Sequence, residues 1–278
     1  MKTSSRQITY ILPGKKWNGF NWHEIWLYRE LVVALVRREL QSRYRQTVAS
    51  VIWVLGQPLL TMIVMSMVLT HITSESQQGI PTPLFVYSGL IPWAYINQAL
   101  YKITLSFVQD PGLVTRVYFP RILIPLAVAI AALADFAITF LLLPVLLIMY
   151  GTTPSLTLLA LPLVIGLMIV AVFGIGLLLA SFNAEFRDVA FAVPFLLQLG
   201  LFVTPIFYST ESIELPWRYL YALNPFVGVI EAMRWSLLNP SNSLPLDLFL
   251  ISALSAFSIL IGGLYIFQRR EPNMADVI

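Results

Sequence analysis

Long apolar runs, separated by short polar segments, make up most of the chain. Six runs approach or exceed the roughly 20 residues that an α-helix needs to cross the hydrocarbon core of a membrane. They are residues 48–70, 84–107, 122–150, 156–182, 189–208 and 246–267. The pattern predicts an all-α integral membrane protein in which residues 47–278 form one domain of six transmembrane helices. Composition agrees, because 11% of the 278 residues are charged, against about 25% in a soluble domain.

Residues 22–46 have a different pattern. Apolar side chains recur there at spacings of three or four, with arginines between them: Trp22, Ile25, Trp26, Val32, Val36 and Leu40. The spacing predicts an N-terminal amphipathic helix that lies in the membrane interface, either as an anchor or with a face for a partner protein. Residues 1–21 form an N-terminal extension to which we assign no role.

A polar segment, residues 108–121, divides the second apolar run from the third. Asp110 can cap a short helix that has Pro111 in its first turn, and Pro120 ends that helix. Such a helix is too short to span a bilayer. We interpret the segment as the place where another protein pushes on the membrane domain.

Two more short helices are predicted between the fifth and sixth runs, at residues 216–222 and 224–238, with Asn224 and Pro225 starting the second. The second is about 21 Å long, less than the roughly 30 Å of the hydrocarbon core, so we expect re-entrant helices. Aromatic residues gather in and beside them: Phe207, Tyr208, Trp217, Tyr219, Tyr221, Phe226 and Trp235. These residues form either an interfacial belt or a ring at an exit, where flat aromatic faces suit the C–H faces of sugars.

The positive charges predict the orientation. Fourteen of the 17 lysines and arginines lie on the side that holds both termini, whereas Arg218 and Arg234 lie on the opposite side. We therefore expect a multi-pass protein of the cytoplasmic membrane with both termini in the cytoplasm and the two short helices outside. A basic N-terminal segment could also suggest nucleic acid, but its aromatic and aliphatic content favours a membrane surface.

Catalytic motifs are absent from the sequence. It contains no phosphate-binding G-x-x-x-x-G-K-[ST] loop, no metal-ligand spacing and no cysteine, and its two histidines are far apart. We expect neither an enzyme nor a bound cofactor. A membrane enzyme acting on polyprenyl lipids is the alternative, and it would need clustered acids that the sequence lacks.

Three charged features have two readings each. Asp135, near the middle of the third run, is either a proton or substrate site or an acid that is neutral or bonded to a neighbouring span. Glu231 and Arg234 either form a simple i, i+3 pair or position the second short helix as a gate. The turn at residues 183–188 is either solvated or a partner contact.

Several motifs resemble the membrane subunits of ABC-2-type polysaccharide exporters, the family that exports O-antigen, teichoic acid and capsule. They are Tyr28-Arg29-Glu30-Leu31, Val36-Arg37-Arg38-Glu39-Leu40, Arg43-Tyr44-Arg45-Gln46-Thr47, Trp53-Val54-Leu55-Gly56-Gln57-Pro58-Leu59, Tyr118-Phe119-Pro120-Arg121, Phe186-Arg187-Asp188 and Leu223-Asn224-Pro225-Phe226-Val227-Gly228. They occur in order, from Trp26 to the C-terminus, at spacings like those of the family.

The resemblance implies a homodimer of six-span subunits that binds two copies of a cytoplasmic ATPase, which uses ATP and Mg²⁺. The substrate would be a polyprenyl-linked polysaccharide such as O-antigen, exported from the cytoplasmic leaflet. Teichoic acid, capsule or a small amphipathic drug is the alternative. The interface helix and a coupling helix in residues 108–121 would meet the ATPase through Asp110, Leu113, Arg116, Tyr118, Arg121, Arg37 and Arg38. The glycan path and its gate would comprise the seven aromatic residues above with Glu231 and Arg234.

Overall fold

A computed structural model describes residues 26–44, 49–72, 79–109, 119–152, 156–238 and 244–271, and every regular element in these ranges is a helix. The predicted all-α class is therefore confirmed for this part of the chain. The α-helices are α2 (Arg29–Tyr44), α3 (Ala49–Ile72), α4 (Thr82–Gln109), α6 (Leu123–Leu141), α7 (Leu143–Met149), α8 (Leu161–Glu185), α9 (Val189–Val203), α10 (Trp217–Tyr221), α11 (Pro225–Leu238) and α12 (Leu246–Arg270). Two short 3-10 helices, η2 (Leu156–Ala160) and η3 (Thr210–Ser212), precede α8 and α10.

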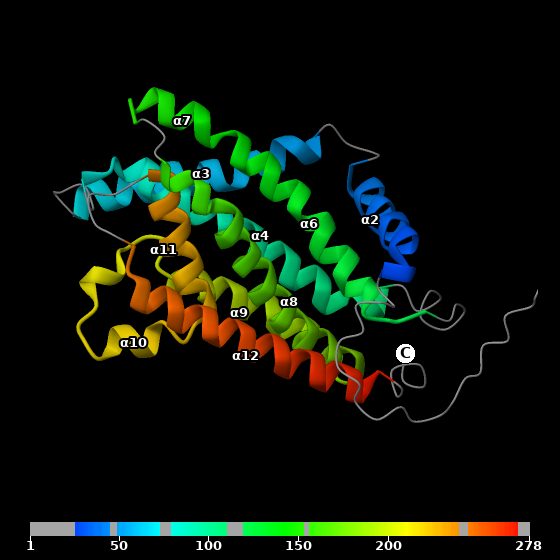
Figure 1. Ribbon diagram of the computed structural model, residues 1–278. Helices are drawn as coiled ribbons and strands as arrows, with labels where there is room; N and C mark the ends of the chain where they lie inside the picture. The colour runs from blue at the N-terminus through cyan, green and yellow to red at the C-terminus, as the bar shows by residue number, and fades with distance from the viewer. Residues whose placement is uncertain are drawn as a thin grey trace, which may run out of the picture.

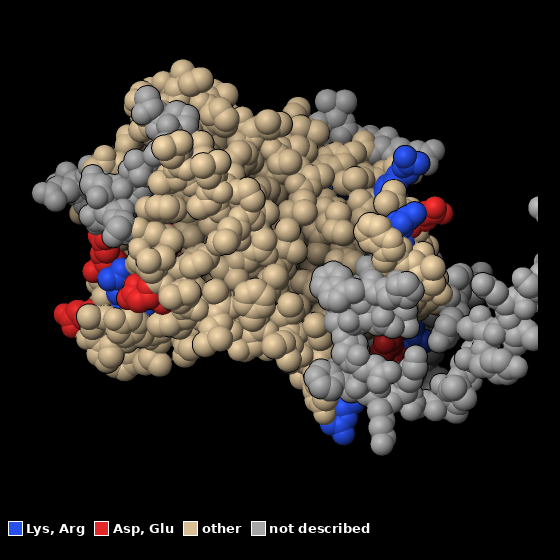
Figure 2. Space-filling model, viewed as in Figure 1, with Lys and Arg blue, Asp and Glu red and all other residues tan. Residues whose placement is uncertain are grey.

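Four helical segments are long and apolar enough to cross a membrane: Val51–Ile72, Leu123–Met149, Leu156–Glu185 and Leu246–Arg270. They coincide with four of the six predicted spans. The face of the molecule in Figure 2 agrees, because its charged side chains lie at the two ends and a broad uncharged band separates them.

The other two predicted spans are also helices, but they differ from the first four. Helix α4 has 28 residues, and most side chains between Leu84 and Phe107 are buried against other helices. A helix enclosed by protein can carry polar residues that a lipid-facing helix cannot. Helix α9 has 15 residues and ends at Val203, before the predicted end of its run, because Thr204 is extended (φ −96°, ψ 146°) ahead of Pro205.

The predicted third span forms one membrane-length segment, which a break at Leu142 divides into two helices. Helix α6 ends at Leu141 and α7 begins at Leu143, with Leu142 between them. Pro144 lies in the first turn of α7. Proline has no amide hydrogen, so it cannot continue the hydrogen-bond ladder of the preceding helix.

Helix α4 lies in the middle of the bundle, next to α3, α6, α8 and α11 (Figure 1). Helix α2 lies at the end of the bundle where α12 ends, whereas α10 and α11 lie at the opposite end (Figure 1).

Small residues let α8 approach its neighbours closely. A Cβ atom on Gly174 would lie 2.7 Å from the Cα of Leu260 in α12, and one on Gly176 would lie 2.8 Å from the Ile103 side chain in α4. Real Cβ atoms do not approach that closely. These glycines therefore bring α4, α8 and α12 into direct contact.

Candidate functional site

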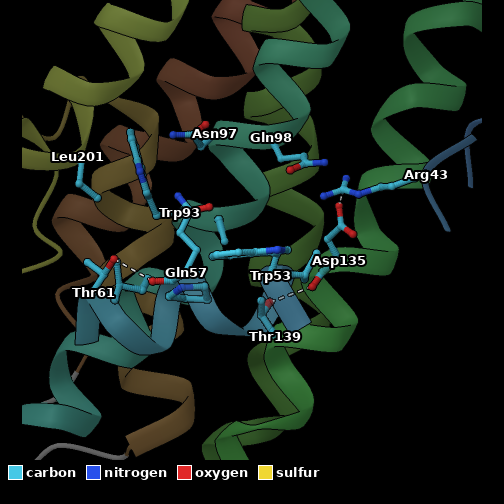
Figure 3. Close-up of a pocket in the computed structure, with 14 residues that line it drawn as sticks. Arg43, Trp53, Gln57, Thr61, Trp93, Asn97, Gln98, Asp135, Thr139 and Leu201 are labelled. Carbon is cyan, nitrogen blue, oxygen red and sulfur yellow. Dashed lines mark hydrogen bonds and ion pairs between the residues drawn. The ribbon is translucent and has the colours of Figure 1, made fainter. Parts of the chain in front are cut away.

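A cavity of about 430 Å³ lies among α3, α4, α6 and α9 (Figure 3). Half of the residues that line it carry neutral hydrogen-bonding groups or tryptophan rings, and most of the others are aliphatic. Helix α3 contributes Trp53, Gln57 and Thr61; α4 contributes Trp93, Asn97 and Gln98; α6 contributes Asp135 and Thr139; α9 contributes Leu201; and α2 contributes Arg43.

The lining side chains can hold a ligand rich in hydroxyl groups. Amides both donate and accept hydrogen bonds, as hydroxyls do, and an indole ring offers a flat apolar face. Among the lining residues Arg43 and Asp135 carry charge, and they form an ion pair with each other. The wall is therefore nearly neutral.

Trp93 is held in place by residues of two other helices. Its ring meets that of Phe226 in α11 edge-on, with the centroids 6.4 Å apart and the planes at 88°. A Cβ atom on Gly200 of α9 would lie 2.8 Å from the Trp93 ring. Glycine at position 200 thus provides the space that the ring occupies beside the cavity.

Asp135 binds two residues of the interface helix α2. The Arg43 guanidinium pairs with one carboxylate oxygen (Figure 3), and the Tyr44 hydroxyl donates to the other. The Asp135 side chain is 8% exposed and that of Arg43 is 21% exposed. Burial and the hydrogen bond to Asp135 raise the pKa of the Tyr44 hydroxyl, which favours its protonated, hydrogen-donating form.

These contacts support the interpretation of Asp135 as a bonded acid. The acid is hydrogen-bonded, as one reading held, but its partners lie on the interface helix and not on a neighbouring span. Sequence reasoning missed them because it considered titratable residues within the same span, whereas Tyr44 is 91 positions away.

A second ion pair attaches α2 to the bundle. Lys102 of α4 binds Glu39 of α2, and both side chains are about a quarter exposed. Leu35 is the buried residue of α2, and Val32 and Val36 pack against the core, so this side of the predicted apolar face contacts protein.

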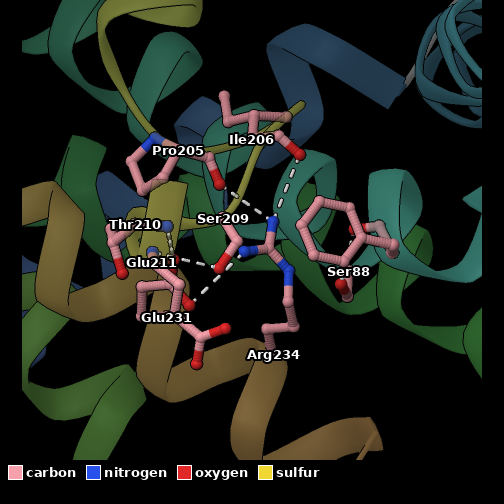
Figure 4. Close-up of polar contacts among 9 residues, drawn as sticks. Ser88, Pro205, Ile206, Ser209, Thr210, Glu211, Glu231 and Arg234 are labelled. Atoms are coloured by element: carbon pink, nitrogen blue, oxygen red, sulfur yellow. Dashed lines mark hydrogen bonds and ion pairs between the residues drawn. The ribbon is translucent and has the colours of Figure 1, made fainter. Parts of the chain in front are cut away.

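At the opposite end of the bundle, Arg234 forms a buried network (Figure 4). Its Nη2 atom donates to the carbonyl oxygens of Pro205 at 2.8 Å and Ile206 at 3.1 Å. Its guanidinium also lies 3.7 Å from the centroid of the Phe85 ring. Arg234 thereby joins α11 to α4 and to the segment that follows α9.

The predicted pair of Glu231 with Arg234 is confirmed, at 3.5 Å. The Glu231 carboxylate also accepts a hydrogen bond from the Thr210 amide over 3.1 Å. Both side chains are buried. In this conformation they hold the 204–210 segment rather than face a path, and the gating role stays a prediction.

The predicted aromatic residues lie in different surroundings. Trp217 and Tyr219 of α10 are exposed, whereas Phe207 and Phe226 are buried and Trp235 is partly buried. The hydroxyls of Tyr208 and Tyr221 lie 2.6 Å apart. The structure does not bring the seven rings together into one exposed ring, so a shared role as an exit stays a prediction.

Four of the residues predicted to contact an ATPase lie outside the described residues: Asp110, Leu113, Arg116 and Tyr118. Arg37 and Arg38 are exposed on α2. Arg121 binds Glu271 at the end of α12, through its amide at 3.0 Å and through its guanidinium to the Glu271 carbonyl. At the exposed end of α8, Glu185 pairs with Arg270 of α12.

Metal ligands are not grouped in the described part of the chain, where no three His, Asp or Glu side chains lie close enough together to hold an ion.

Comparison with known proteins places this architecture in a family. Residues 30–238 match the model of the ABC-2 type transporter, and the chain therefore belongs to that family. Members are membrane subunits of ATP-driven transporters, which implies a separate ATPase partner. The family and the apolar helices together indicate a multi-pass protein of the inner membrane.

Similar proteins have related printed names. The chain is 30% identical over 260 residues to the O-antigen export system permease protein RfbA of Myxococcus xanthus, covering 92% of this chain and 98% of the relative. It is 26% identical over 251 residues to the protein of the same name from Klebsiella pneumoniae, covering 90% and 95%. It is also 26% identical over 248 residues to the polysialic acid transport protein KpsM of Escherichia coli, covering 87% and 94%.

Proposed function

We propose that the chain is the membrane subunit of an ATP-driven exporter of lipid-linked polysaccharide, with an O-antigen-like glycan as cargo. Two copies of the chain would assemble with two copies of a cytoplasmic ATPase, which binds ATP and Mg²⁺. The similarity to O-antigen export permeases supports this assignment. The observation that carries it is the neutral, amide-lined cavity within the apolar bundle.

The cavity suits a glycan better than a purely apolar molecule. Gln57, Asn97 and Gln98 are costly within a membrane protein unless they have partners, and sugar hydroxyls would supply partners as a polysaccharide passes. Trp53 and Trp93 would pack against the C–H faces of the rings. A small amphipathic drug would not require several amides on adjacent helices.

The charge of the cavity favours a neutral glycan over an acidic one. Polysialic acid and teichoic acid carry a negative charge on most units, so their path would need unpaired cations. Arg43 is the cation of this cavity wall, and Asp135 neutralises it. We therefore prefer an O-antigen-like cargo, and keep capsule export as a second candidate because of the similarity to a polysialic acid transport protein.

We also propose that the chain crosses the membrane six times and has both termini in the cytoplasm. Helix α4 is about 42 Å long at 1.5 Å per residue, enough to cross the membrane inside the bundle. Helix α9, at about 22 Å, would cross together with the segment that Arg234 holds. The excess of lysines and arginines on the side of α2 supports a cytoplasmic location for that side.

The ATPase would bind at the α2 end of the bundle. Exposed Arg37 and Arg38 lie on α2. The predicted coupling segment, residues 108–121, comes just before α6 in the sequence and ends at Arg121. At the other end, α10 and α11 would form the exit, with Trp217 and Tyr219 at its surface and Glu231 and Arg234 fixing its position.

A reconstituted complex tests the function. The full chain and its ATPase partner are placed in proteoliposomes, and ATP hydrolysis is measured with a polyprenyl-linked neutral glycan, a polyprenyl-linked sialic acid polymer or a polyprenyl phosphate. We expect the neutral glycan to stimulate hydrolysis most. Equal stimulation by polyprenyl phosphate would contradict a glycan path, and stronger stimulation by the acidic polymer would favour the capsule candidate.

A further inference from the structure

Arg43 connects the interface helix with the cavity. It belongs to α2, at the end of the bundle, and it also lines the cavity among the spans (Figure 3). Its partner Asp135 lies on the cavity wall contributed by α6. The ion pair therefore crosses the boundary between the interface helix and the cavity.

The pair is well placed to fix α2 against α6. Asp135 is almost fully buried, and a buried carboxylate that loses its partner is strongly destabilised. Tyr44, the next residue of α2, donates a hydrogen bond to the same carboxylate. Thr139, one turn later on α6, donates over 3.0 Å to the Asp135 carbonyl oxygen and also lines the cavity.

We propose that the contact of Asp135 with Arg43 and Tyr44 is a positioning element that keeps one side of the cavity closed. While the contact is intact, the Arg43 side chain covers the cavity between α2 and α6. When α2 moves away from α6, Arg43 is withdrawn and that side opens to water. The idea that an ATPase moves α2 rests on the proposed function. The closure of the cavity by Arg43 does not.

The neighbouring pair of Glu39 with Lys102 provides a natural comparison. It also joins α2 to the bundle, but neither residue is among those that line the cavity. Loosening this pair should weaken the attachment of α2 without removing the side chain that covers the cavity. Breaking each pair in turn therefore distinguishes closure of the cavity from general attachment of α2.

Thiol labelling can test the closure, because the natural sequence contains no cysteine. Gln98 points toward Arg43, whereas Thr61 lies on the other side of the cavity (Figure 3). Gln98→Cys or Thr61→Cys is introduced into the full chain with its ATPase in membrane vesicles without nucleotide. The rate of reaction with a charged methanethiosulfonate is then measured in the unchanged, Asp135→Asn, Tyr44→Phe and Glu39→Gln backgrounds.

We expect Asp135→Asn to raise the labelling rate of Gln98→Cys at least several-fold, and Tyr44→Phe to raise it less. Glu39→Gln should leave it unchanged, and Thr61→Cys should react at one rate in all backgrounds. An unchanged rate in Asp135→Asn, or an equal rise in Glu39→Gln, would overturn the proposal.

The labelling result is independent of the cargo. If glycans fail to stimulate ATP hydrolysis but Asp135→Asn still exposes Gln98→Cys, the proposed function fails and the closure stands. If glycans stimulate hydrolysis and the labelling rates do not differ, the closure fails and the proposed function stands.

Discussion

The main-chain amide of Arg121 donates a hydrogen bond to the Glu271 carboxylate over 3.0 Å, although the two residues are 150 positions apart in the sequence. The Arg121 guanidinium also binds the Glu271 carbonyl at the end of α12. Cationic side chains stabilise helix C-termini in this way. The end of the 108–121 segment is therefore attached to α12 within one chain.

Arg121→Ala should therefore destabilise the chain even without an ATPase. Loss of a partly buried, charge-assisted hydrogen bond should lower the free energy of unfolding by about 1 kcal/mol. Unfolding in detergent checks this, with Arg187→Ala in the exposed turn after α8 as the control. Unchanged stability of Arg121→Ala, together with lost ATPase binding, would instead assign Arg121 to the partner contact.

Arg234→Met should destabilise the outer end of the bundle severely. The substitution leaves Glu231 buried without its cation and removes two hydrogen bonds to the 205–206 carbonyls. Removing one member of a buried pair costs about 3–5 kcal/mol. Arg234→Met with Glu231→Leu should lose less than Arg234→Met alone, as measured by unfolding in detergent. Equal losses in the single and double variants would show that the pair contributes little.

Gly263→Ala and Gly262→Ala form a matched pair on α12. A Cβ atom on Gly263 would lie 2.5 Å from the Gly174 carbonyl oxygen, whereas nothing lies within 4 Å of one on Gly262. We expect Gly263→Ala to cost about 1–3 kcal/mol through overpacking. Gly262→Ala should be neutral or stabilising by up to about 1 kcal/mol, because alanine favours a helix. Equal thermal unfolding temperatures would contradict the close approach of α8 and α12.

Trp53→Ala should slow export without affecting assembly. The Trp53 side chain is 70% exposed in this chain and lines the cavity, so its removal leaves the packed core intact. Loss of one aromatic contact with the cargo, worth about 1 kcal/mol, predicts a roughly fivefold weaker response of ATP hydrolysis to glycan. Trp53→Phe should retain most of the response, and Leu60→Ala on the same helix should retain all of it. A fall in Leu60→Ala as large as in Trp53→Ala would indicate a general effect on α3.

Local signals in the sequence predicted much of the fold. Asn224 predicted the start of α11, and its side chain accepts from the Phe226 amide at 3.1 Å. Pro205, which restricts Thr204, explains why α9 ends before its apolar run does. The close contact of α8 with α12 follows from Gly174. Each of these features depends on residues within one turn or on the size of one side chain.

The cavity could not be predicted in the same way. Gln57, Asn97 and Gln98 are polar residues within apolar runs of the sequence. The cavity that they line exists because α3 and α4 pack with α6 and α9 around one space. The partners of Asp135 required the packing of α2 against α6. The break between α6 and α7 was missed because hydropathy continues across Leu142, although Pro144 signals it.

The most direct measurement is capture of the cargo in the cavity. A photo-crosslinking amino acid replaces Asn97, and in separate cells Leu254, whose side chain is 71% exposed on α12. Cells that export polysaccharide are illuminated, and the purified chain is probed for attached glycan. Because the proposed glycan path runs through the cavity, we expect a glycan ladder on the chain from Asn97 that requires an ATPase able to hydrolyse ATP, and none from Leu254. Equal capture at both positions, or none at Asn97 during active export, would contradict it.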